Sequence, residues 1–100
     1  MTEGNKVTYE ERRKIYNEAL LEFGADCQIT KAVEEMSELT KELCKYMVGS
    51  GNLFHIVEEL ADVTIMCEQL RIIFDCNQDV CNEMDKKVKR LSLRIEERRV

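Results

Sequence analysis

Two short acidic blocks contain the residues of this chain best suited to chemistry. The blocks are EEMSE at positions 34–38 and EELAD at positions 58–62. Each holds two carboxylates three residues apart, and these pairs are Glu35 with Glu38 and Glu59 with Asp62. Residues at i and i+3 share one face of a helix, with Cβ atoms about 5–6 Å apart, so each pair can bind one cation.

Antiparallel packing of the two helices would set the pairs opposite each other around one space. By helical rotation, Glu59 and Asp62 lie about 60° and about 120° from the centre of the apolar seam of their helix, so they border apolar surface. Carboxylates gathered there repel one another and are costly to desolvate unless cations neutralise them. A ligand set of oxygen atoms alone suits a hard ion, Mg²⁺ or Mn²⁺, better than zinc. We therefore predict a metal site formed by Glu35, Glu38, Glu59 and Asp62.

Basic and polar residues complement the acidic blocks. Lys87, Arg90 and Arg94 follow the spacing i, i+3 and i+7 near the C-terminus. A basic stripe beside an acidic metal site is typical of polyphosphate binding, because the metal holds some phosphate oxygens while Lys and Arg hold others. Gln28 and Lys31 extend the acidic stripe towards the N-terminus, where they could contact the base or the phosphates of a nucleotide.

Caps and breaks place the first two helices. A capping box of Thr8 and Glu11 begins a helix over about 9–23, and Gly24 is a natural C-cap. Asp26 is expected to cap the second helix, which runs to the break at Gly49-Ser50-Gly51-Asn52.

The third helix is expected over about 53–75, and the fourth begins near Asn77 or Asp79 and frays into the charged tail at 96–99. The third helix is apolar on most of its sides, which indicates a central place among several neighbours or against a second subunit. Four helices with short connections predict an antiparallel four-helix bundle that assembles as an oligomer.

Composition supports one all-α domain. The chain has 100 residues, no Pro, 35% charged and 44% hydrophobic residues, a mixture that suits long amphipathic helices. The net charge of −5 argues against general nucleic-acid binding. We expect a cytoplasmic protein, since the N-terminus lacks the apolar run of a signal peptide, no stretch approaches the about 18 apolar residues of a membrane span, and the five Cys include no CxxC pair.

The blocks EEMSE and EELAD, each in a helix and separated by a Gly-containing loop, resemble the MazG family of all-α nucleoside triphosphate pyrophosphohydrolases. The family pattern of an EExxE block followed by an ExxD block is complete here, and the later KVKRL at 87–91 resembles the family's basic C-terminal helix. The resemblance covers about residues 25–95 and implies a single MazG-like helical domain over 1–100.

The resemblance also implies an activity and roles for individual residues. The family cleaves nucleoside triphosphates between the α and β phosphates, giving a monophosphate and pyrophosphate, and its members commonly form dimers or tetramers. By matching positions, the four carboxylates would bind magnesium, with Mn²⁺ as a possible substitute. Glu34, or another carboxylate such as Glu35 or Glu38, would aid the attacking water, and Lys87 and Arg90 would meet phosphate.

Two other classes of function compete with this interpretation. A di-iron carboxylate protein typically needs two Glu-x-x-His pairs, but the only histidine, His55, has no Glu three residues before it. A non-catalytic helical interaction protein, including an inactive family member, remains the alternative. Glu42 and His55 are expected to be solvated surface residues.

Overall fold

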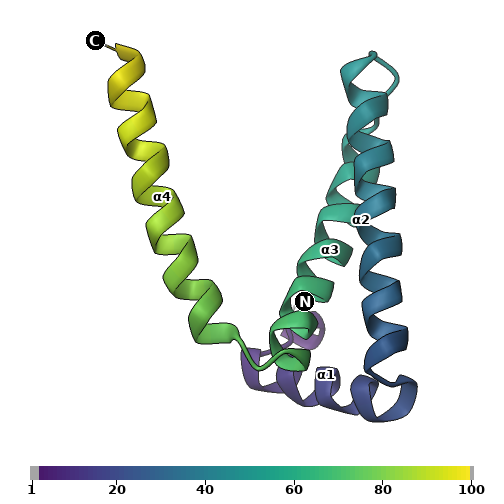
Figure 1. The fold of residues 1–100 in the computed structure, drawn as a ribbon. Coiled ribbons are helices and arrows are strands. Elements are labelled where there is room, and N and C mark those ends of the chain that lie inside the picture. The colour runs from purple at the N-terminus through teal and green to yellow at the C-terminus, as the bar shows by residue number, and fades with distance from the viewer. Residues whose placement is uncertain (1–2, 100) are drawn as a thin grey trace. The chain divides into compact units, whose positions relative to one another are not determined.

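The computed structural model describes residues 3–99, and these residues form an all-helical structure (Figure 1). A short 3-10 helix, η1 (Glu3–Asn5), precedes four α-helices, which are α1 (Tyr9–Phe23), α2 (Ala25–Met47), α3 (Leu53–Ile73) and α4 (Asn77–Arg99). Residues 3–99 include no β-strand. The predicted all-α class with four helices is confirmed. By its internal contacts the chain divides into two compact units, Met1–Leu70 and Arg71–Val100.

The start of α1 is fixed by the capping box that the sequence predicts. Thr8 Oγ1 accepts a hydrogen bond from the Glu11 backbone N–H at 3.1 Å, and the Glu11 carboxylate accepts one from the Thr8 N–H at 3.3 Å. Gly24 ends α1, with its N–H donating to the Leu20 carbonyl at 3.0 Å. Gly24 has φ of 87°, a conformation that glycine adopts without a Cβ penalty.

The same glycine also begins α2, and this overturns one prediction. Gly24 is the N-cap of α2, while Asp26 lies within its first turn. The prediction that Asp26 caps α2 is therefore wrong, because one positive-φ glycine makes the whole connection and leaves no room for a separate cap. Asp26 still places a negative charge near the positive end of the helix dipole.

The predicted break between α2 and α3 is confirmed. Asn52 caps α3, since its side-chain oxygen accepts hydrogen bonds from the N–H groups of Phe54 at 2.8 Å and His55 at 3.4 Å. At Gly51 a Cβ atom would lie 2.5 Å from the Cα atom of Tyr46, so only glycine lets the chain pass this close to the end of α2.

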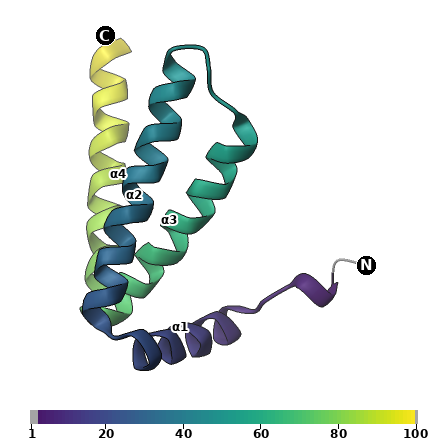
Figure 2. The ribbon, with the colours of Figure 1, turned by 90° about the vertical axis from the view of Figure 1, so that its right-hand side faces the viewer.

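In the first unit, α2 and α3 form an antiparallel hairpin, and α1 crosses the end of the hairpin opposite its loop (Figures 1 and 2). Gln28 near the start of α2 meets Gln69 near the end of α3, which fixes the antiparallel register. Helix α1 is joined to α3 through Glu68, which accepts a hydrogen bond from the Tyr16 hydroxyl and lies 3.3 Å from Arg12 Nε.

Few side chains of the hairpin are fully buried. The buried apolar residues of the described chain are Tyr16, Ala32, Ile56 and Met66. Large apolar side chains on both helices remain exposed, among them Val33, Met36 and Leu43 on α2 and Val57, Leu60 and Ile65 on α3. The broad apolar surface predicted for the third helix is thus present, and much of it faces solvent.

The second unit contains the last residues of α3, a turn and α4. Arg71 donates to Asn77 Oδ1 at 3.3 Å and to Met84 Sδ at 3.5 Å, which ties the end of α3 to the start of α4. Helix α4 exposes a stripe of apolar residues, Met84, Val88, Leu91 and Ile95. Among the described residues, no helix is long and apolar enough to cross a membrane.

Candidate metal centre and the adjoining cavity

Three of the four predicted metal ligands converge. Glu35 on α2 and Glu59 and Asp62 on α3 each offer one carboxylate oxygen, and these oxygens lie within 4.8 Å of one another. The antiparallel hairpin brings the two acidic blocks to the same level, so carboxylates 24 residues apart in the sequence become neighbours. The spacing of these oxygens suits a single divalent cation placed between them.

Glu38, the fourth predicted ligand, lies outside this group of three. Its side chain is exposed, one turn further along α2 than Glu35. It is nevertheless near enough for its negative charge to raise the pKa of Glu59. Its role as a ligand stays a prediction.

The negative charge of the cluster formed by Glu35, Glu59 and Asp62 is only partly compensated by nearby cations. Partial burial raises the pKa of Glu59, and the charges of Glu35, Asp62 and Glu38 raise it further. Partial burial and then Glu35 likewise raise the pKa of Asp62, which Lys31 lowers in part. Glu59 Oε2 is buried and has no hydrogen-bond partner within the described part of the chain. A buried carboxylate oxygen without a partner is costly, so the donor set fits a hard cation.

Lys31 links the carboxylates to the neighbouring surface of α2. Its ammonium nitrogen lies 3.2 Å from Glu35 Oε1, one turn away along the helix. This hydrogen bond raises the pKa of Lys31. The Lys31 side chain is 53% exposed and lines the cavity, so its ammonium group can contact both Glu35 and an anionic ligand in the cavity.

A cavity of about 840 Å³ adjoins the carboxylates and is lined by α1, α2 and α3. Five of the residues singled out in the sequence line it, namely Gln28, Lys31, Glu34, Glu35 and Asp62. The remaining lining residues were not predicted, and these are Phe23, Cys27, Thr30, Ile65, Met66 and Gln69. This volume lies within the range of small-molecule sites.

Gln69 is the lining residue that the sequence analysis missed most clearly. It is only 5% exposed, and its amide bonds to that of Gln28 across the hairpin. The one signal available in the sequence was its position seven residues after Asp62, with Met66 between them at i+4, because two turns return a side chain to the same helix face. A polar residue on that face of an apolar helix was the feature to notice.

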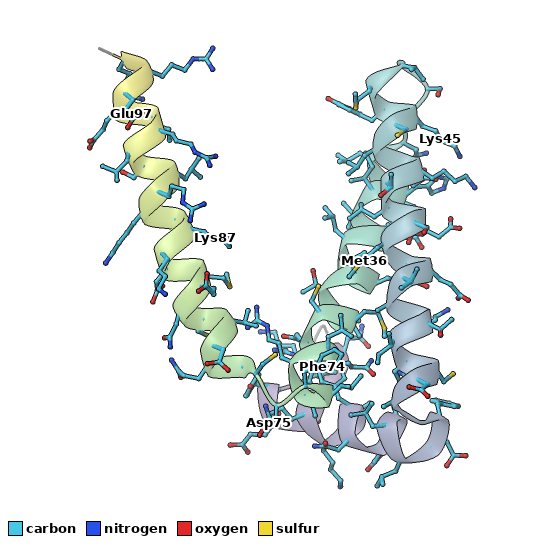
Figure 3. All side chains as sticks on the ribbon, viewed as in Figure 1. Met36, Lys45, Phe74, Asp75, Lys87 and Glu97 are labelled. Atoms are coloured by element: carbon cyan, nitrogen blue, oxygen red, sulfur yellow. The ribbon has the colours of Figure 1, made fainter. Side chains whose placement is uncertain are left out.

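A second buried carboxylate lies on the same hairpin, nearer the loop. Glu42 is 6% exposed, so the expectation of a solvated surface residue is wrong. Its two oxygens lie 3.4 Å from Lys45 Nζ and 3.6 Å from His55 Nδ1. Lys45 lies near the loop end of α2 (Figure 3). The cationic and polar partners of Glu42 are therefore supplied by the protein itself.

The predicted phosphate-binding residues of the C-terminal helix belong to the second unit. Lys87, Arg90 and Arg94 lie on α4 with exposed side chains, and Lys87 is seen extending from that helix in Figure 3. Their contact with a substrate stays a prediction.

Comparison of the chain with protein-family models, with curated proteins and with solved structures finds no match. The resemblance to the MazG family therefore depends on the two acidic blocks and on the basic segment of the last helix.

Proposed function

We propose that this protein is a magnesium-dependent nucleoside triphosphate pyrophosphohydrolase of the MazG-like type, which cleaves an NTP or dNTP between the α and β phosphates. The observation that carries the proposal is the convergence of Glu35, Glu59 and Asp62 at the edge of a cavity, with Glu59 Oε2 buried and without a hydrogen-bond partner among residues 3 to 99. The products are a nucleoside monophosphate and pyrophosphate, and the role is housecleaning of the nucleotide pool.

The residues that would hold magnesium are Glu35, Glu59 and Asp62, with Glu38 as the fourth ligand and Mn²⁺ as a substitute ion. The bound ion supplies a Lewis acid that polarises the phosphoryl group and lowers the pKa of water. The protein's contribution is to hold these carboxylates in fixed positions on two packed helices, which limits the reorganisation needed during the reaction.

Two further side chains at the cavity have distinct tasks in this proposal. Glu34 lines the cavity with an exposed carboxylate, and it would accept a proton from the attacking water. Lys31 lines the cavity together with Glu35, 3.2 Å away, and its ammonium group would bind phosphate oxygens. Lys87 and Arg90 of α4 would bind the remaining phosphate charge.

The active form is proposed to be a cytoplasmic homodimer or homotetramer. The exposed apolar residues of α2 and α3 support this, since monomeric soluble proteins seldom expose large contiguous apolar patches. The same exposed surface favours the alternative function, a non-catalytic helical interaction protein or an inactive family member.

A screen of the purified protein separates these functions. Each of the common NTPs and dNTPs is incubated with the protein and Mg²⁺, and pyrophosphate and orthophosphate are measured separately. The proposal expects pyrophosphate from one or a few nucleotides, with no release after EDTA is added. Orthophosphate alone, or no product from any nucleotide together with no magnesium-dependent stabilisation, would contradict it and favour the interaction protein.

A further inference from the structure

The loop end of the α2–α3 hairpin carries a group of strongly exposed apolar side chains. Residues 46–54, which we call the hairpin tip, comprise the end of α2, the loop and the start of α3. The five large apolar side chains of the tip are between 65% and 81% exposed, and these are Tyr46, Met47, Val48, Leu53 and Phe54. Monomeric soluble proteins seldom leave large apolar patches without a binding partner.

The apolar side chains of the tip point in several directions. Successive residues of a helix are about 100° apart around its axis, so Tyr46 and Met47 diverge, as do Leu53 and Phe54. Within the first unit the tip is the free end of the hairpin, since α1 crosses the opposite end (Figures 1 and 2). A flat protein partner would bury one side of the tip, whereas a lipid surface would surround it and bury all sides.

The tip also lies in the longest stretch of the sequence without Asp or Glu. This stretch runs from 43 to 57, in a chain that has 20 acidic residues and a net charge of −5. Lys41 and Lys45 have exposed side chains beside the tip and supply positive charge there. An anionic surface attracts a cationic segment that lacks carboxylates and repels an acidic one.

Glu42, the acidic residue immediately before this stretch, has its charge compensated inside the protein. It is 6% exposed, and its carboxylate lies 3.4 Å from Lys45 Nζ and 3.6 Å from His55 Nδ1. The negative charge nearest the tip along α2 is therefore withdrawn from the surface. The charge pattern of the tip thus favours an anionic, apolar partner.

We propose that the hairpin tip inserts into the surface of an anionic lipid bilayer. Its apolar side chains enter the boundary between headgroups and acyl chains, a level that suits the rings of Tyr46 and Phe54, while Lys41 and Lys45 bind lipid phosphates. The contact is peripheral, because no helix in the part of the chain that the structure describes is long and apolar enough to cross a membrane. This membrane contact goes beyond the proposed function and does not depend on it.

Flotation of the full chain with lipid vesicles tests the proposal without nucleotide or metal. Vesicles of phosphatidylcholine alone are compared with vesicles of phosphatidylcholine and phosphatidylglycerol in equal parts, at low ionic strength. The wild-type protein is expected to float with the anionic vesicles and to bind the neutral ones at least about fivefold more weakly. Failure of the folded wild-type protein to float with the anionic vesicles would overturn the proposal.

Single substitutions test whether the tip makes the contact. Met47→Asp and Phe54→Asp each replace an exposed apolar side chain by a carboxylate, and each is expected to weaken vesicle binding at least about tenfold. Helical content should be unchanged, because neither side chain is buried. Leu21→Asp is the matched control, since Leu21 is 88% exposed on α1, and this variant should bind as wild type does. Binding retained in both tip variants would assign it to another surface, such as the basic helix α4, and would overturn the proposal.

A protein partner is the competing occupant of the tip. Sedimentation velocity without lipid measures the oligomeric state, which is expected to be the same in wild type and Phe54→Asp. An oligomer that dissociates in Phe54→Asp, together with no vesicle binding by wild type, would make the tip an assembly contact and overturn the proposal.

The outcomes also separate this inference from the proposed function. The carboxylates proposed to bind magnesium lie further along the hairpin, so Phe54→Asp is expected to release pyrophosphate as wild type does. Vesicle binding without pyrophosphate release would end the proposal of catalysis alone. Pyrophosphate release without vesicle binding would end the membrane contact alone.

Discussion

Two groups of carboxylates on one helical hairpin differ in how their charge is compensated. Glu42, near the loop, is almost fully buried and has both Lys45 and His55 within 4 Å. The cluster of Glu35, Glu59 and Asp62 contains three carboxylates. Among residues 3–99 it has only Lys31 as a close cation, and Glu59 Oε2 has no hydrogen-bond partner there. Burying a carboxylate is tolerable only where its charge is balanced.

The difference supports the proposal that the cluster of Glu35, Glu59 and Asp62, and not Glu42, binds a cation. Glu42, with its partners Lys45 and His55, forms a structural contact between the end of α2 and the start of α3. In the cluster, Glu35 and Asp62 line a cavity, and burial, followed by the neighbouring carboxylate charges, raises the pKa values of Glu59 and Asp62. Perturbed carboxylates at a cavity are typical of functional sites.

The largest expected effect is on turnover. Glu59→Gln or Asp62→Asn should lower kcat more than about a hundredfold, because each removes a charged ligand of the proposed metal. The helical content, measured by circular dichroism, should be unchanged. Glu42→Gln is the matched control on the same hairpin and should keep activity within about threefold. Equal losses in all three variants would remove the distinction between the two groups.

The next effect is on stability. Here Glu42→Gln is expected to be the harmful substitution and Glu59→Gln the harmless one, the opposite of their effects on turnover. Glu42→Gln should lower the free energy of unfolding by about 1 kcal/mol, since it removes a charged partner from Lys45 and His55. Without metal, Glu59→Gln should increase stability, because it removes a carboxylate whose charge is disfavoured first by burial and then by repulsion from its neighbours. Urea denaturation in EDTA measures both, and a destabilised Glu59→Gln protein would show that the cluster is structural.

The sequence predicted the main contents of the site because local rules determine them. The capping box at Thr8 and the break before Asn52 set helix ends, and matching i, i+3 pairs on antiparallel helices placed Glu35 near Glu59 and Asp62.

What the sequence left open depends on tertiary register. The burial of Glu42 arises from where α3 begins beside α2, and the Gln28–Gln69 bond arises from the alignment of the two helices over their whole length. The periodicity of a single helix reveals neither where α3 begins beside α2 nor how the two helices are aligned. The Asp26 cap failed for a different reason, since Gly24 has two roles at once.

A smaller effect is expected on the pH dependence of stability in the metal-free protein. The pKa values of Glu59 and Asp62 are raised in the folded state, so the folded protein binds more protons than the unfolded chain between the ordinary and the raised values. Stability should therefore rise as the pH falls through this interval and stop changing below the ordinary pKa values. Comparison of Asp62→Asn with wild type in EDTA measures the effect, and the variant should show a shallower slope. An identical slope in both proteins would contradict the assignment.

The smallest effect is expected at alkaline pH, at the contact between α1 and α3. Burial, followed by the hydrogen bond to Glu68, raises the pKa of Tyr16 to about 12. The unfolded tyrosine ionises near pH 10, so stability should fall as the pH rises from about 10 towards 12. In Tyr16→Phe the part of this loss that comes from Tyr16 should disappear, at a cost of about 1 kcal/mol at neutral pH. A wild-type slope retained in Tyr16→Phe would assign the loss to other groups.

Magnesium binding measured by calorimetry tests the central comparison most directly, with wild type, Glu59→Gln and Glu42→Gln titrated in parallel. The account predicts that wild type and Glu42→Gln bind Mg²⁺ with similar affinity and that Glu59→Gln binds at least about tenfold more weakly. Equal binding by all three proteins, or no binding by wild type even with a nucleotide present, would contradict it.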